Sequence, residues 1–194
     1  MTKLIEFYFD FISPYSYLAH KQIQNIQKEK KIKFLYKPIL LGGLHNLIGI
    51  TAPAFINSKA KFMIRDCKII SKKFNIKFKF NPLFPINSLN LLRGLIGCSS
   101  DRKNSYIDNF FNAYWQDSLN LKDERIIFEI LKKIKVRKSH FLKSTTDPII
   151  KDKLRNLTHE AFKKDIFGAP TFLINNKIFW GQDRLEFALD EYNK

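Results

Sequence analysis

The sequence predicts an α/β protein in which sheet-forming segments at the two ends of the chain enclose a large all-helical insertion. Three observations predict it. An apolar strand near the N-terminus runs through a turn into an amphipathic helix, the middle of the chain has helical periodicity, and the last thirty residues contain two short strands before a final helix. With 194 residues, 45% of them hydrophobic, the chain can form one large domain or a small domain with an insertion.

The first segment is predicted to form a strand, a helix and a second strand. Residues 4–11 are almost all apolar or aromatic, as expected for a central strand buried on both faces. The helix is expected from about Pro14 to Lys30, with Ser13 as its N-cap and Pro14 in its first position. Residues 32–39 alternate in the manner of a second strand.

The middle of the chain, from about residue 45 to residue 165, is predicted to be all helical. The Leu-Gly-Gly-Leu segment at 41–44 interrupts the pattern before it, and residues 81–85 are expected to form a loop between two prolines. The expected helices cover residues 54–74, 89–97, 101–116, 123–133, 139–142 and 148–162. The first of them carries Phe55, Phe62, Ile69 and Ile70 on one side. The expected N-caps are Asn87 or Ser88, Asp123 and Asp147.

The end of the chain is predicted to be a β-hairpin and a helix. Residues 171–174 and 177–180 read as strands joined by the Asn175-Asn176 turn, and a helix follows from 181 to about 192. The whole order, βαβ then helices then ββα, is that of a thioredoxin-like fold with a helical insertion. We therefore expect residues 1–45 and 165–194 to form the thioredoxin-like domain and residues 46–164 to form the insertion domain.

The net charge of +16 raises the question of nucleic-acid binding. The chain has 27 Lys and only 7 Arg, and the lysines are spread along its length. Specific readers of nucleic acid depend on Arg for bidentate contacts, so compositional drift in an AT-rich genome is favoured over a binding surface. No apolar run approaches the roughly 20 residues of a membrane span. Met1-Thr2-Lys3 leads directly into the first strand without an export signal, so a cytoplasmic location is expected.

The cysteines and histidines do not suggest a metal or redox centre. Cys67 and Cys98 are far apart and lack redox or metal-ligand spacing, so both are expected to be small buried apolar residues. The four histidines are scattered, and none of their spacings is that of a metal site.

Ser13-Pro14-Tyr15-Ser16 stands where a thiol-disulfide oxidoreductase carries Cys-x-x-Cys, between the first strand and its helix. Serine cannot form a disulfide, but a helix N-terminus with a hydroxyl can donate hydrogen bonds to an anion such as the thiolate of a bound thiol. Ser13 is therefore the candidate catalytic residue. The alternative, favoured on the turn alone, is that Ser13 only caps the helix. Ser16 points into the first helical turn and is interpreted as structural.

Two further pieces are candidates for ligand binding. The Ala169-Pro170 bond precedes the hairpin, where thioredoxin-like folds have a cis proline whose preceding residue offers its backbone to a peptide-like ligand; the alternative is an ordinary trans proline. Asp183 is interpreted as holding the amine of a γ-glutamyl group, with Gln182 and backbone N–H groups holding its carboxylate. The alternative for Asp183 is a helix-capping acid.

Three stretches together resemble the family of 2-hydroxychromene-2-carboxylate isomerases, which are relatives of kappa-class glutathione transferases within the DsbA-like group. The first stretch is Phe7 to Ala19, the second is Asn81 to Leu89 with Arg93, and the third comprises 167–172 and 179–185. The resemblance covers nearly the whole chain.

The resemblance implies glutathione as the cofactor and an aromatic, electrophilic small molecule as the substrate. It implies that Ser13 contacts the glutathione sulfur, that Ala169 and Pro170 bind its backbone, and that Gln182 and Asp183 hold its γ-glutamyl end. The implied reaction is a cis–trans isomerisation in aromatic catabolism, by reversible thiolate addition to the ring-opened form of the substrate. Relatives are often dimers, so a homodimer is also implied, with no nucleic-acid or membrane partner.

One position departs from the family pattern. Ile50 stands where members usually carry an Asn that helps to bind ligand, and isoleucine cannot supply a polar contact. Lys59 and Lys61 are nearby candidates for holding a substrate carboxylate, although solvated surface is favoured for both. Two alternatives therefore stay open, a kappa-like glutathione S-transferase acting on other electrophiles and a redox-inactive thioredoxin-like binding protein.

Overall fold

The computed structural model describes residues 3–194, and its sheet has the predicted topology. Strand β1 (Ile5–Phe9) pairs in parallel with β2 (Phe34–Pro38) and antiparallel with β3 (Thr171–Ile174). Strand β4 (Lys177–Trp180) pairs antiparallel with β3, which gives the order β2-β1-β3-β4. The predicted fold, a mixed sheet built from βαβ and ββα units around a helical block, is confirmed. Met1 and Thr2, on which the leader prediction partly rests, lie outside the described residues.

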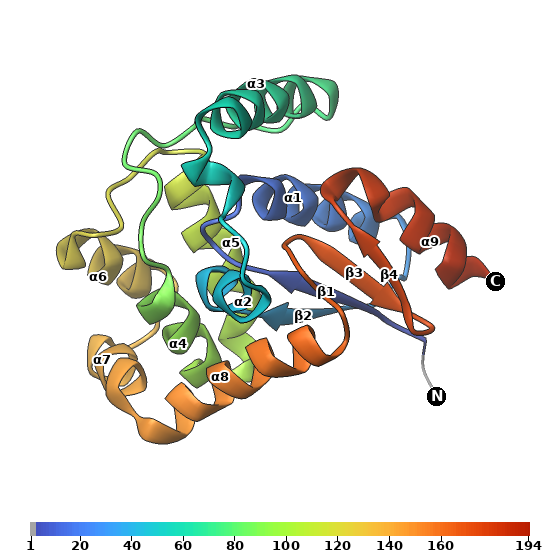
Figure 1. Ribbon diagram of the computed structural model, residues 1–194. Helices are drawn as coiled ribbons and strands as arrows, with labels where there is room; N and C mark the ends of the chain where they lie inside the picture. The colour runs from blue at the N-terminus through green and yellow to red at the C-terminus, as the bar shows by residue number, and fades with distance from the viewer. Residues whose placement is uncertain (1–2) are drawn as a thin grey trace.

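Helices cover both faces of the sheet (Figure 1). Helices α1 (Pro14–Glu29) and α9 (Leu185–Asn193) lie over one face, and α2 (Leu41–Ile48) and α8 (Pro148–Lys163) lie over the other. The remaining elements are α3 (Asn57–Lys73), α4 (Leu89–Gly97), α5 (Lys103–Trp115), α6 (Glu124–Lys133), α7 (Lys138–Thr146) and the 3-10 turns η1 (Pro53–Phe55), η2 (Ser100–Arg102) and η3 (Gln182–Arg184). None of the helices in residues 3–194 has the length and apolar composition needed to cross a membrane.

The helix starts follow their capping residues. The Ser13 hydroxyl accepts a hydrogen bond from the Ser16 N–H at 3.1 Å, and Pro14 opens α1. Asp123 and Asp147 cap α6 and α8 as predicted, each through its carboxylate. These caps are local in sequence, which is why they could be predicted.

Helix α2 corrects the prediction that residues 41–44 interrupt the helical pattern. Its N-cap, Leu40, has no capping side chain, but two distant residues take over that role. The Asp10 carboxylate accepts from the Leu41 N–H at 2.9 Å, and the Thr158 hydroxyl accepts from the Leu40 N–H at 3.0 Å. Tertiary contacts thus stabilise a helix that its two glycines disfavour.

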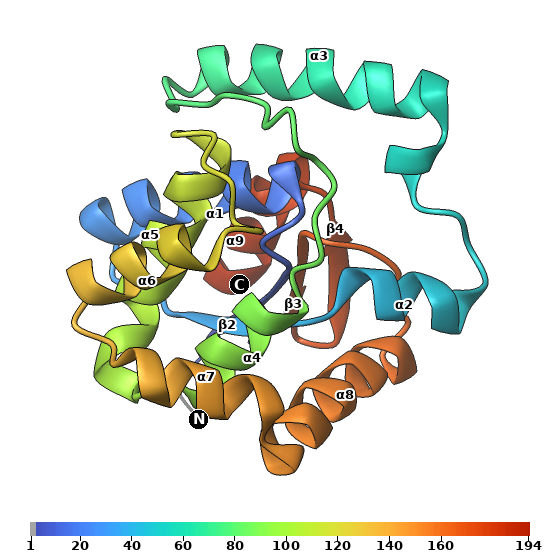
Figure 2. The same cartoon turned by 90° about the vertical axis from the view of Figure 1, so that its left-hand side faces the viewer.

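Helix α3 also differs from expectation. It lies across one end of the molecule (Figure 2), and it buries Met63, Cys67 and Ile70. The residues predicted to share one side of this helix do not do so. Phe62 and Ile69 face solvent with exposed fractions of 64% and 65%, Ile70 is buried, and Phe55 lies in η1 before the helix, 70% exposed. Helix α7 is longer than expected and α5 begins only after a 3-10 turn, because helix ends depend on tertiary contacts. Cys67 and Cys98 are buried as predicted, and burial raises the pKa of the Cys67 thiol.

One aromatic core joins the sheet to the helical block. Phe9, the last residue of β1, and Phe11, which follows the strand, both contact Phe111 of α5, with ring centroids 5.7 and 5.0 Å apart. The Trp115 indole N–H donates to the Phe11 carbonyl at 2.8 Å. The end of β1, immediately before the Ser13 turn, is therefore fixed from the helical side. The division into two domains stays a prediction.

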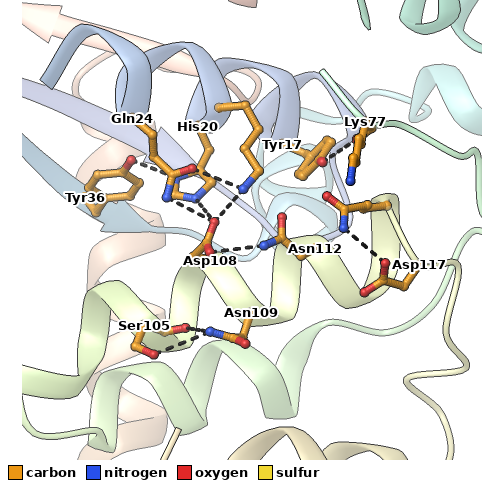
Figure 3. Close-up of polar contacts among 12 residues, drawn as sticks. Tyr17, His20, Gln24, Tyr36, Lys77, Ser105, Asp108, Asn109, Asn112 and Asp117 are labelled. Atoms are coloured by element: carbon orange, nitrogen blue, oxygen red, sulfur yellow. Dashed lines mark hydrogen bonds and ion pairs between the residues drawn. The ribbon is translucent and has the colours of Figure 1, made fainter. Parts of the chain in front are cut away.

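A polar cluster ties α1 to α5 (Figure 3). Asp108 of α5 accepts from Lys21 at 2.6 Å and Gln24 at 3.0 Å, and its Oδ1 lies 3.3 Å from Nε2 of buried His20. The other ring nitrogen of His20 lies 2.8 Å from the Tyr36 hydroxyl of β2. Burial lowers the pKa of His20. Burial pushes the pKa of Asp108 upward, but hydrogen bonds from His20 and Lys21 outweigh it and hold that pKa well below its usual range.

We expect Asp108→Ala to lower the free energy of unfolding by about 3 kcal/mol, because it leaves His20 and Lys21 without their shared acceptor. Urea unfolding at neutral pH, followed by tryptophan fluorescence, measures this change. The control is Asp101→Ala, which removes an exposed carboxylate paired with Arg102. Equal effects of the two substitutions would contradict the assignment of this cluster as a structural joint.

Candidate functional site

The Ser13 turn faces the proline loop, which is the arrangement predicted for the two most important pieces. The Ser13 hydroxyl donates to the Ala169 carbonyl at 3.0 Å, across 156 residues of sequence. The Ala169-Pro170 peptide bond is cis, as predicted. Ser13 is only 4% exposed, however, and its single proton is already given to Ala169. Donation to an added anion therefore requires the hydroxyl to turn away from that carbonyl.

Other donors lie at the same helix end. Ser16 gives its N–H to the Ser13 hydroxyl and Tyr17 gives its N–H to the Ser13 carbonyl, while Pro14 has no N–H. Among the described residues, the Tyr15 N–H is thus the donor of this first turn that has no partner, at the positive end of the helix dipole. The buried Ser16 hydroxyl has no partner among residues 3–194. The turn can therefore offer donors to an anion but has no thiol of its own.

The proline loop is fixed by the hairpin that follows it. The Thr171 hydroxyl donates to the Gly168 carbonyl at 2.7 Å, and the Gly181 N–H donates to the Pro170 carbonyl at 3.0 Å. A Cβ on Gly168 would lie 2.6 Å from the Trp180 indole nitrogen, so a larger residue here would require this ring to move. These contacts hold the loop rigidly beside Ser13.

Gln182 and Asp183 begin the 3-10 turn that follows this hairpin. Gly181, at φ +110°, turns the chain into it. The Gln182 side chain is buried and accepts from the Gln22 amide of α1 at 2.9 Å, so it ties the turn to α1 rather than extending outward. The Asp183 side chain is 58% exposed and lies 3.3 Å from Arg184. Its carboxylate is accessible, as a contact with an ammonium group would require.

Asp10 is a site neighbour that the sequence analysis missed. It is completely buried at the end of β1, and its backbone carbonyl accepts from the Ser13 N–H at 3.0 Å. Its carboxylate accepts from the Ile12 N–H at 3.2 Å and from the Leu41 N–H at 2.9 Å. It therefore joins the Ser13 turn to α2. The signal available in the sequence was a single aspartate at the end of a largely apolar strand, shortly before the Ser13 turn.

Burial raises the pKa of Asp10 to about 6, although hydrogen bonds from the Ser88 hydroxyl and from the Leu41 and Ile12 N–H groups act in the opposite direction. A carboxylate with no cation among these partners depends on N–H and O–H donors alone for its charged form. The same donors orient the three segments that meet at it.

Other residues singled out in the sequence have different environments. Ile50 lies exposed just after α2, so the position that carries Asn in the resembled family is apolar here. Lys59 and Lys61 are exposed near the start of α3. Asn81 is buried and donates to the carbonyls of Tyr114 and Leu119, which is a structural role.

Comparison with known proteins agrees with the fold. The family model for the DsbA-like thioredoxin domain matches residues 4–193. The chain belongs to this family. Among DsbA-like proteins, it is 26% identical over 194 residues to a 2-hydroxychromene-2-carboxylate isomerase of Sphingobium xenophagum, covering 99% of this chain and 98% of that protein.

Two further proteins resemble this chain along most of its length. Glutathione S-transferase kappa 1 of Rattus norvegicus is 23% identical, covering 95% of this chain and 88% of that protein. The solved structure of a 2-hydroxychromene-2-carboxylate isomerase superimposes with a TM-score of 0.89 at 23% identity, covering 98% of this chain and 94% of that one. The DsbA-like fold, including its helical insertion, is thus shared along the whole chain.

We expect Asp10→Asn to change how stability depends on pH. The folded-state pKa of about 6 lies above the usual 3.8, so the folded protein binds this proton more firmly. The stability that this group contributes is present below pH 4 and is lost as the pH rises through 6, by about 3 kcal/mol in all. The free energy of unfolding of the native protein minus that of the variant should fall by this amount between pH 3 and pH 7, as measured by urea unfolding.

The matched control is Asp190→Asn, which removes an exposed carboxylate on α9. A difference between native protein and Asp10→Asn that stays constant over this pH range would contradict the buried, partly protonated carboxyl.

Proposed function

We propose that this protein is a glutathione-dependent cis–trans isomerase of the 2-hydroxychromene-2-carboxylate type, acting in the breakdown of aromatic compounds. The observation that carries the proposal is the 3.0 Å contact between the Ser13 hydroxyl and the proline loop, where a redox relative would present a cysteine. Similarity over nearly the full length to proteins named as such isomerases supports it.

The residues present suit glutathione, which combines a thiol, a peptide backbone, a carboxylate and an ammonium group. Ala169 and Pro170 would bind the peptide backbone, since they border the Ser13 turn. Asp183 would hold the ammonium group through its accessible carboxylate. The backbone N–H groups at the start of η3 would hold the γ-glutamyl carboxylate, while Gln182, bonded to Gln22, positions that turn.

Bound glutathione would supply the nucleophilic thiolate that this chain lacks at the turn. The chain's own contribution is electrostatic. The α1 N-terminus, the Tyr15 N–H and a turned Ser13 hydroxyl together favour an anion over a neutral thiol at this place. The Ala169 carbonyl holds the Ser13 proton until such an anion is bound. Ser13 is therefore the proposed catalytic residue, and Ser16 supports the turn.

Disulfide exchange by this chain's own thiols is disfavoured. Cys67 is buried on α3 and Cys98 is buried after α4, so neither belongs to the Ser13 turn. Burial raises the pKa of both thiols, which lowers their reactivity at neutral pH.

A second function is favoured by Ile50. Ile50 replaces the polar side chain found at this position in the resembled family with an exposed apolar one, which would suit other electrophiles. The similarity to kappa-class glutathione transferases supports this alternative. Conjugation of glutathione to 1-chloro-2,4-dinitrobenzene, without isomerisation of the chromene carboxylate, would favour it. Glutathione binding without either reaction would favour a binding protein.

We expect Ser13→Ala to lower kcat/KM for isomerisation of 2-hydroxychromene-2-carboxylate about 100-fold, because one preorganised donor to a developing charge is removed. The reaction is followed by ultraviolet absorbance with and without glutathione. Turnover that does not need glutathione, or that is unchanged in Ser13→Ala, would contradict the proposal.

The Ser13→Ala variant also loses a helix cap, which costs about 1 kcal/mol of stability. Asp147→Ala is the matched control, because it removes the N-cap of α8 and does not alter the Ser13 turn. Isomerase activity should survive in this control, so that the loss in Ser13→Ala reports on the hydroxyl.

A further inference from the structure

A cavity of about 490 Å³ lies between α2, α4 and α8. Its lining includes none of the residues proposed to bind glutathione, and Ser13 and Asp10 are also outside it. The volume falls within the range of small-molecule sites, roughly 300–1,000 Å³. The cavity is thus a separate concave surface on the α2–α8 side of the molecule.

Two cationic side chains reach this cavity from α8. Lys151 and Arg155 line it four residues apart, and His159 lies four residues further along the same face of the helix. Like charges at such spacing slightly destabilise a helix, so this alignment does not add to the stability of α8. Asp152 is the one carboxylate among the lining residues, and it is paired with Arg155 at 3.0 Å.

Arg93 adds a fixed guanidinium from α4. One of its terminal nitrogens donates to the Thr145 carbonyl at the end of α7, at 3.0 Å, which holds the group in place. Its Nε is buried and has no partner among residues 3–194. An Nε buried this deeply is out of reach of a ligand in the cavity, so the terminal nitrogens of the guanidinium would make the contact with an anion. The bond to Thr145 distinguishes Arg93 from the many solvated lysines of the chain.

The rest of the lining is largely apolar. Leu40 is the N-cap of α2 and Leu47 lies on that helix, while Leu89 comes from α4 and Leu154 comes from α8. A fully hydrated ion would leave these side chains in contact with water, whereas a molecule with an apolar body would cover them. The presence of Asp152 also disfavours a ligand with several negative charges.

We propose that this cavity is a binding site for a small amphipathic monoanion, an aromatic or aliphatic body that carries one carboxylate. The carboxylate binds between Arg93 and the Lys151–Arg155 face of α8, and the apolar body packs on the leucines. The site does not depend on the proposed isomerase activity. The start of α2 connects the cavity to the Ser13 region. The Leu40 N–H donates to the Thr158 hydroxyl, which lines the cavity, and the Leu41 N–H donates to the Asp10 carboxylate, which lies beside the Ser13 turn.

The test uses 2-naphthoate as the probe and 2-naphthamide as its uncharged counterpart. Titration calorimetry on the full chain should show binding of 2-naphthoate, with affinity for the amide at least tenfold weaker. Arg155→Gln and Lys151→Gln should each weaken 2-naphthoate binding about tenfold, because each removes a charge-assisted contact. Lys153→Gln is the matched control, since it removes the same charge from an exposed position of α8 that does not line the cavity.

Several results would overturn the proposal. One is the absence of 2-naphthoate binding, and another is equal affinity for 2-naphthoate and its amide. A third is a loss of 2-naphthoate affinity in Lys153→Gln as large as that in Arg155→Gln, which would indicate diffuse attraction to a basic chain. Loss of binding in Ser13→Ala would place the probe at the Ser13 turn instead. Unchanged binding in Ser13→Ala, together with losses in the two cavity variants, would support the separate site.

Discussion

The hydrogen bond from the Ser13 hydroxyl to the Ala169 carbonyl is the contact on which the functional account depends. It is 3.0 Å long and joins the N-terminus of α1 to the proline loop, two segments from opposite ends of the chain. The segments proposed to hold glutathione are connected to this bond by further hydrogen bonds. The Gly181 N–H donates to the Pro170 carbonyl, and the Gln22 amide of α1 donates to the Gln182 side chain. A thioredoxin-like scaffold keeps the two segments facing each other, whether the turn carries sulfur or oxygen.

Two further hydrogen bonds hold the Ser13 turn in the position that this contact requires. Asp10 links the Ser13 turn to α2, and the Trp115 indole holds the Phe11 carbonyl from the helical block. The helical insertion therefore holds the end of β1 in place, and the Ser13 turn follows directly from that end. A turn held in place with the unpaired Tyr15 N–H at its helix end suits stabilisation of an anion, since a preorganised donor needs little rearrangement when charge develops.

The fold and the main site pieces could be predicted because their signals are local. Ser13 and Pro14 begin a helix, the Asn175-Asn176 turn makes a hairpin, and both motifs have recognisable spacing. Helix α2 could not be predicted, since its caps come from Asp10 and Thr158, far away in sequence. The hydrogen bond that occupies the Ser13 hydroxyl and the one that turns the Gln182 side chain toward α1 also could not be predicted. Both are made with partners more than 150 residues away in sequence, which periodicity cannot reveal.

The most direct test of the central claim is an ultraviolet titration of glutathione bound to the protein, which measures the pKa of its thiol. A free thiol of this kind has a pKa of about 8.5, and a site that favours the anion lowers it. The account predicts a bound-thiol pKa at least about one unit lower in the native protein, and a return toward the free value in Ser13→Ala. A bound thiol whose pKa equals that of free glutathione, or does not respond to the loss of the Ser13 hydroxyl, would contradict it.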